Sequence, residues 1–134
     1  MEAYKRYIIE DWSLPELKIW IVDGKSVRET YSLEFIDGGH DLVYPEFIPP
    51  NEVWLDSSNS PDELPFNVFH EVYERWLMLQ GLQYDTAHEY ANKLEKMLRD
   101  KGDIGLTSQV IKNFVKRNVE LNQTIECEFV LATN

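Results

Sequence analysis

Two histidines and a glutamate have the spacing of a metal site. His70 and Glu74 are four residues apart. On a helix, residues at this spacing lie one turn above each other, so an imidazole and a carboxylate would face the same side. His88 follows 14 residues after Glu74, and a tight turn near residue 81 would bring it beside that carboxylate. We therefore predict a metal site made of His70, Glu74 and His88.

The chemistry predicted for this set is hydrolysis. Two imidazoles and one carboxylate, with a fourth position open to water, are a ligand set of catalytic zinc sites. Glu71 adjoins His70 and would act as the general base that takes a proton from the attacking water. The set favours zinc, with manganese or iron as alternatives. It departs from the H-E-x-x-H motif of zinc peptidases, because Glu74 stands where that motif has its second histidine.

Glu95 and His40 are candidate supporting residues. Glu95 lies seven residues after His88, on the same helical stripe. It could be a further ligand, or it could accept a hydrogen bond from a ligating histidine. His40 follows the pair Gly38-Gly39, which allows a sharp turn or a close approach of the backbone. It could complete the site from a loop, although we favour a role in capping a turn.

The same residues also fit a protein without catalytic activity. Asp and Glu make up 24 of the 134 residues, so a carboxylate four residues after a histidine is a weak signal by itself. In this interpretation, the histidines and glutamates form a hydrogen-bond network that pins two helices to a sheet. Arg75 and Glu71 would be an ordinary surface pair. The acidic first half would bind a basic protein or peptide partner, as expected of an interaction or structural protein of a phage or mobile element.

Length and charge limit the classes of protein that this chain can represent. Its 134 residues fit a single domain spanning 1–134. The net charge of -11 argues against nucleic acid as a partner. A single cysteine, Cys127, forms no disulfide within the chain. The sequence has no signal-peptide pattern and no apolar run that could cross a membrane, so we expect a cytoplasmic protein. No feature of the sequence indicates an oligomeric state.

The first third of the chain has the pattern of strands. The apolar run 19–22 and residues 27–31 flank Asp23-Gly24, a dipeptide typical of a tight β-hairpin. Residues 53–55 can form another short strand, after a segment broken by prolines.

The rest of the chain has mainly helical periodicity. Apolar residues recur at three- and four-residue intervals over 66–77, with Pro65 in the first turn and Gly81 as the end of the helix. A second helix would have Asp85 or Thr86 as its N-terminal cap and would stop at Gly102. The short link at 81–84 makes the two helices an antiparallel hairpin.

Residues 110–119 suit a third helix and 124–131 a strand. The predicted fold is therefore α+β, with a small and mainly antiparallel sheet packed on the helical hairpin, a third helix and a terminal strand.

The order of motifs over residues 18–98 resembles a group of short, uncharacterised proteins of bacteria, archaea and phages. The resemblance is carried by Ile19–Gly24, Val27-Arg28, Gly38–His40, Tyr44–Pro49, Glu52–Asp56, His70-Glu71, Glu74-Arg75, Met78, Gly81, Tyr84-Asp85, Ala87-His88 and Glu95. It points to His40, Asp56, Glu71, Glu74 and His88 without implying a reaction. The H-E pair at the start of a helical turn looks like a zincin at the level of the motif, which implies an amide or ester substrate.

Overall fold

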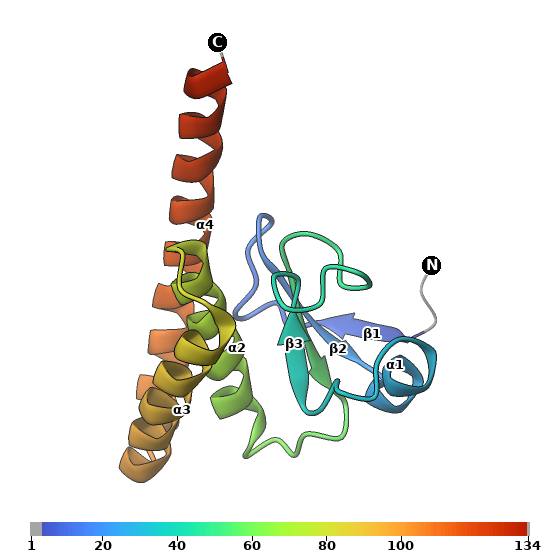
Figure 1. Ribbon diagram of the computed structural model, residues 1–134. Helices are drawn as coiled ribbons and strands as arrows, with labels where there is room; N and C mark the ends of the chain where they lie inside the picture. The colour runs from blue at the N-terminus through green and yellow to red at the C-terminus, as the bar shows by residue number, and fades with distance from the viewer. Residues whose placement is uncertain (1–3, 134) are drawn as a thin grey trace.

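The computed structural model describes residues 4–133, with side chains as far as residue 128, and has the predicted α+β fold (Figure 1). Four strands and four helices follow one another in the order β1 (Lys5–Ile8), β2 (Lys18–Val22), α1 (Gly24–Thr30), β3 (Gly38–His40), β4 (Glu52–Asp56), α2 (Leu64–Leu79), α3 (Tyr84–Lys101) and α4 (Ile104–Thr133). None of these helices combines the length and the apolar composition required to cross a membrane.

The sheet is mixed, with strand order β1-β2-β4-β3. The β1–β2 and β3–β4 pairs are antiparallel, whereas β2 and β4 are parallel. The hairpin predicted across Asp23-Gly24 is wrong, because the chain enters α1 at Gly24. A parallel pair needs a crossover connection, so the segment after β2 has to leave the sheet before β4 can form beside it.

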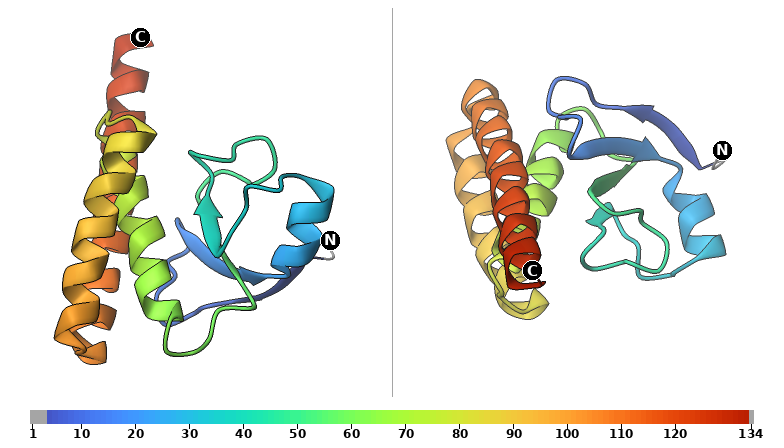
Figure 2. Two further views of the ribbon diagram at one scale, coloured as in Figure 1. Left: turned by 60° about the horizontal axis from the view of Figure 1, so that its bottom comes forward. Right: turned by 90° about the horizontal axis from the view of Figure 1, so that it is seen from above.

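The two faces of the sheet belong to two separate apolar clusters. Ile19, Ile21, Val53 and Leu55 pack with the helices α2, α3 and α4. Their sequence neighbours Val22 and Trp54 pack on the opposite face with Val27 of α1 and with Phe35, Phe47 and Ile48 of the following loops. This alternation follows from the two-residue period of a strand. The three long helices therefore lie on one side of the sheet and α1 on the other, as both views of Figure 2 show.

The predicted helical hairpin is confirmed by α2 and α3. Pro65 lies in the first turn of α2, and Gly102 ends α3 in the left-handed conformation with φ of 63°. The second helix begins earlier than predicted, because α3 starts at Tyr84 with Gln83 in the cap position, two residues before Asp85.

The third helix is also confirmed, but the strand predicted for residues 124–131 is wrong. These residues continue α4 as far as Thr133, and α4 extends past the ends of α2 and α3 (Figure 1). Neither glycine nor proline occurs after Gly105. Each further residue of an uninterrupted helix adds a backbone hydrogen bond, so the helix propagates through a stretch whose side chains also alternate like those of a strand.

Candidate metal centre

His70, Glu74 and His88 converge as the sequence predicted. His70 and Glu74 lie one turn apart on α2, and His88 reaches them from the second turn of α3. His70 Nε2 is 3.1 Å from Glu74 Oε2 and 3.1 Å from His88 Nδ1, and His88 Nδ1 is 2.9 Å from the same Glu74 oxygen. We call these three atoms the ligand triangle. They are close enough to hold a metal ion.

Protons alone do not satisfy the ligand triangle. Burial raises the pKa of Glu74, but its hydrogen bonds with His40 and His70 outweigh this effect and lower the pKa to about 2, so the carboxylate is ionised. Each imidazole nitrogen has one in-plane position, which holds either a proton or a lone pair. Two protonated nitrogens would oppose each other at 3.1 Å. If only one of these two nitrogens is protonated, the lone pair of the other faces the ionised Glu74 carboxylate, which is repulsive. A cation accepts lone pairs from all three atoms at once.

The size of the ligand triangle also suits an ion. A tetrahedral ion with zinc-like ligand distances separates its ligand atoms by about 3.3 Å. The edges of 2.9, 3.1 and 3.1 Å are within a few tenths of an ångström of that separation.

Glu95 orients His70. Its Oε1 lies 2.9 Å from His70 Nδ1, and its Oε2 accepts a hydrogen bond of 2.8 Å from Arg99 Nε. The Nδ1–H group therefore donates to Glu95, which turns His70 Nε2 toward Glu74 and His88. Of the two roles predicted for Glu95, this geometry fits the hydrogen-bond acceptor. Burial lowers the pKa of His70, but the hydrogen bonds to Glu74 and Glu95 raise it to about 10 overall, so without an ion Nε2 carries a proton that a metal would displace.

His40 orients Glu74 from the sheet. It is fully buried in β3, and its Nε2 lies 2.9 Å from Glu74 Oε1. Its Nδ1 accepts a hydrogen bond of 3.3 Å from the Leu42 amide, so Nε2 carries the proton and donates to Glu74. Burial lowers the pKa of His40, which favours this neutral form. His40, Glu71 and Glu74 also lie within ligand distance of one another. The proton on Nε2, however, makes His40 a donor to the carboxylate rather than a ligand.

The role of His40 was only partly foreseen. Its bond from Leu42 is the local turn contact that the sequence favoured, but the bond to Glu74 connects residues 34 positions apart. The adjacent Gly38-Gly39 pair was the available signal. A Cβ at Gly39 would lie 2.7 Å from Tyr44 Cε2, and one at Gly38 would lie 2.8 Å from the Trp54 carbonyl oxygen. Glycine is therefore required for β3 to pack this closely.

Glu71 lies beside the ligand triangle without being part of it. It lines a cavity of about 210 Å³ that also contains His70, Glu74 and His88, and we call this space the metal cavity. Burial, followed by the charge of Glu74, raises the pKa of Glu71 to about 8. A nearby cation would favour its ionised form. The metal cavity has room for several water molecules. Glu71 therefore lies where it can accept a proton from one of them.

Asp56 does not belong to this site, although the resemblance pointed to it. Its Oδ1 accepts hydrogen bonds from the amides of Gly24 and Ser58, and its Oδ2 pairs with Arg28 at 3.1 Å. Asp56 thus connects the end of β4 to the start of α1.

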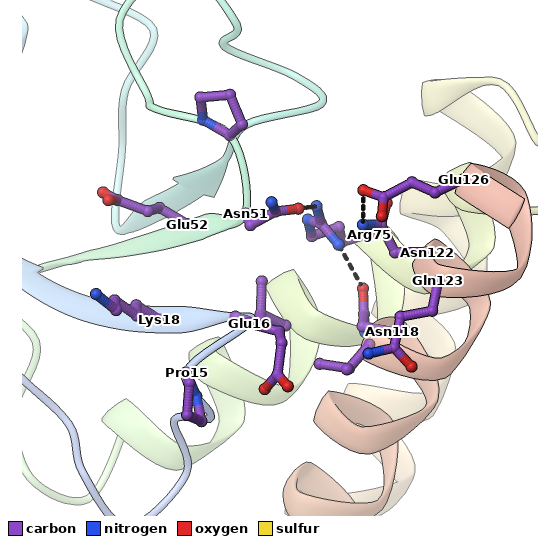
Figure 3. A pocket seen from close by; sticks show the side chains of 13 residues that line it. Pro15, Glu16, Lys18, Asn51, Glu52, Arg75, Asn118, Asn122, Gln123 and Glu126 are labelled. Atoms are coloured by element: carbon purple, nitrogen blue, oxygen red, sulfur yellow. Dashed lines mark hydrogen bonds between the residues drawn. The ribbon is translucent and has the colours of Figure 1, made fainter. Parts of the chain in front are cut away.

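Arg75 is a structural residue that the sequence analysis misassigned. It was expected in a surface pair with Glu71, but it is buried and holds Asp41 with two hydrogen bonds of 2.7 and 3.2 Å. Further bonds reach Asn51 and, at 3.0 Å, Asn118 of α4 (Figure 3). The cavity of about 320 Å³ beside this cluster is larger than the metal cavity. Because the Arg75 guanidinium is paired with groups of the protein itself, we interpret the cluster as a tie between α2, α4 and the loops around the sheet.

Comparison of the chain with protein-family models, curated proteins and solved structures finds no match. The chemistry of the site is therefore the basis of the function proposed below.

Proposed function

We propose that this protein binds a divalent metal ion, with zinc preferred, and uses it to hydrolyse an amide or ester bond. His70 Nε2, Glu74 Oε2 and His88 Nδ1 would be the ligands. The observation that supports the proposal is the ligand triangle, whose three contacts no arrangement of protons satisfies. Glu95 and His40, which orient two of the ligands from behind, have the positions of the hydrogen-bond partners found around metal ligands.

Glu71 would serve as the general base. A bound metal would supply Lewis acidity toward the substrate carbonyl and would lower the pKa of a water molecule beside it. Glu71 accepts a proton as the water oxygen forms its bond to the carbonyl carbon. It then returns that proton to the departing amine or alkoxide, while the C–N or C–O bond breaks. The metal cavity gives Glu71 access to both water and substrate.

Elemental analysis of protein made without a histidine tag tests metal binding. We expect about one ion per chain, and loss of that ion in His70→Ala and in His88→Ala. Glu89→Gln is a matched control, because Glu89 is an exposed neighbour of His88 on α3. Metal-free protein that does not take up added zinc would contradict the proposal.

Glu71→Gln separates catalysis from metal binding. The substitution keeps the size of the side chain but removes the proton acceptor, so we expect metal content to be retained and turnover to fall by about 10²- to 10⁴-fold. Turnover is measured on a panel of chromogenic esters and fluorogenic amides. Undiminished turnover in this variant would exclude Glu71 as the general base.

The interaction protein is the second candidate. The observation that favours it is a continuous polar network, in which Glu95 joins His70 to Arg99 and Arg99 pairs with Glu63 at 2.9 Å. Such a network stabilises packing without an ion. If it is the main role of His70, then His70→Ala will lower stability equally in chelator-treated and untreated samples. Under the metal proposal, the loss is larger in untreated protein. If the protein is an interaction protein, its acidic chain would bind a basic protein or peptide.

A further inference from the structure

The metal cavity continues into a second hollow at the surface. This outer groove has a volume of about 400 Å³ and shares Glu34, Val43, Tyr44 and Tyr84 with the metal cavity. Its other lining residues are Ser32, Leu42, Glu46 and Met78. Because the two hollows share four lining residues, a substrate whose reacting carbonyl lies at the ligand triangle would extend into the outer groove.

Carboxylates are the main charges along this path, and the cationic groups, His70 and a bound metal, lie only at the ligand triangle. Glu71 and Glu74 lie at its inner end, and Glu34 and Glu46 are exposed at its outer end. Among the described residues, neither hollow has a lysine or arginine in its lining. Burial raises the pKa of Tyr44, and the carboxylates of Glu71, Glu34, Glu46 and Glu74 raise it further. A negatively charged group of the substrate would therefore be repelled in the outer groove.

Two tyrosines stand where the metal cavity meets the outer groove. Tyr84 stacks on His88, with ring centroids 5.2 Å apart and an interplanar angle of 26°. Tyr44 is held by a hydrogen bond of 3.1 Å from its hydroxyl to the Glu34 carbonyl oxygen. Aromatic faces beside carboxylates are a favourable environment for an organic cation. The apolar side chains of Leu42 and Met78 suit the aliphatic stem that carries such a cation.

We propose that the substrate is an amide or ester of a lysine- or arginine-like acyl group. Its ammonium or guanidinium lies in the outer groove, near Glu34 and Glu46 and beside Tyr44 and Tyr84. Its carbonyl reaches the ligand triangle. This inference rests on the proposed function, because the metal defines which end of the path holds the reacting bond.

Binding of three hydroxamates to the zinc-loaded protein tests the inference without requiring turnover. The probes are the hydroxamates of Nα-acetyl-arginine, Nα-acetyl-norleucine and Nα-acetyl-glutamate, which present the same metal-binding group with a cationic, neutral or anionic side chain. We expect the arginine probe to bind at least about tenfold more tightly than the norleucine probe. The glutamate probe should bind most weakly. Calorimetry gives the dissociation constants, and zinc content is measured on the same samples.

The double variant Glu34→Gln with Glu46→Gln locates the preference. It should reduce the ratio between the arginine and norleucine probes toward one while zinc content is retained. Glu120→Gln with Glu128→Gln makes the same change in net charge on exposed residues of α4 and should keep the ratio. The inference is overturned if the norleucine probe binds zinc-loaded protein as tightly as the arginine probe, or if the ratio survives in the groove variant. If the purified protein takes up no zinc, the proposed function is overturned instead.

Discussion

At the scale of residues, the candidate site depends on which side chains hold the ligands in place. Glu95 fixes His70, and His40 fixes Glu74, each through a hydrogen bond of 2.9 Å. His88 is different, because 40% of its side chain is exposed and its ring is supported by stacking on Tyr84. His88 is therefore the residue of the ligand triangle on the solvent side of the site, whereas His70 and Glu74 are fixed from within the protein.

Replacing His40 should weaken metal binding without touching a ligand. His40→Leu removes the donor to Glu74 Oε1, so that the carboxylate loses its fixed orientation. We expect zinc affinity to fall about 10- to 100-fold, measured by competition with a chromogenic chelator. His40→Gln keeps an N–H donor and should lose less. Wild-type affinity in a folded His40→Leu protein would show that this bond does not orient the ligand.

The sequence predicted that the three residues of the ligand triangle converge, but it did not predict their surroundings. Spacing on two helices was sufficient to bring His70, Glu74 and His88 together. That spacing does not show how deeply the residues are buried, and the exposed fractions of His70 and Glu74 are only 7% and 2%. Their burial depends on β3, which packs against α2 and brings His40 to Glu74. A partner 34 positions away follows from the topology of the sheet and cannot be read from local periodicity.

At the scale of elements, α1 is the clearest departure from the sequence-based prediction. Asp23-Gly24 is typical of a hairpin, but a Cβ at Gly24 would lie 2.1 Å from Asp56 Oδ2, so glycine is needed here for close packing. The Asp56 carboxylate, 32 positions later, binds the Gly24 amide and holds the start of α1. A tight turn and the close packing of α1 both require glycine at position 24. Only the contact with Asp56 distinguishes the two structures.

Gly24→Ala should therefore be destabilising. The added methyl group overlaps the Asp56 carboxylate, and we expect the free energy of unfolding to fall by about 1–3 kcal/mol in urea titrations. Gly105→Ala is the matched control. Gly105 lies in the first turn of α4, and the atom nearest to its added Cβ, Asp103 Oδ1, is 3.4 Å away. That control should be neutral or slightly stabilising. Equal stabilities of the two variants would contradict the close contact at Gly24.

Asp56 should also make the stability of the fold depend on pH in the acidic range. Burial raises its pKa, but hydrogen bonds from Ser58, Arg28 and Gly24 outweigh this effect and hold the pKa below its usual value of 3.8. A lowered pKa means that its stabilisation is present above pH 3.8 and is lost as the pH falls through the lower folded-state pKa. We expect Asp56→Asn to unfold with a shallower dependence on pH below about 4. An unchanged slope in chemical denaturation at pH 2–4 would contradict this assignment.

At the scale of the whole molecule, the metal would couple two helices that packing already holds together. The ligand triangle joins α2 to α3, and Arg75 joins α2 to α4 through Asn118.

The α+β class and the helical hairpin could be predicted from sequence. The mixed strand order could not, because the parallel pairing of β2 with β4 depends on long-range contacts rather than on the character of either strand.

Zinc should stabilise the folded chain as a whole. An ion that binds the native state at a hundred times its dissociation constant adds about 2.7 kcal/mol, which corresponds to a rise of about 10 °C in Tm for a domain of this size. We expect this rise for the wild-type protein in thermal melts, with reversal by a chelator and no comparable rise for His88→Ala. Equal shifts in the two proteins would indicate that zinc stabilises the fold at another position.

The order of the ligands along the chain has a consequence for biosynthesis. His70 and His88 are separated by only 18 positions, and every residue that orients the ligand triangle precedes α4. A nascent polypeptide on the ribosome therefore contains all three residues of the ligand triangle before the last helix has been translated. Under the proposed function, the donors of the metal site all belong to a segment that is synthesised before α4, and α4 contributes none of them.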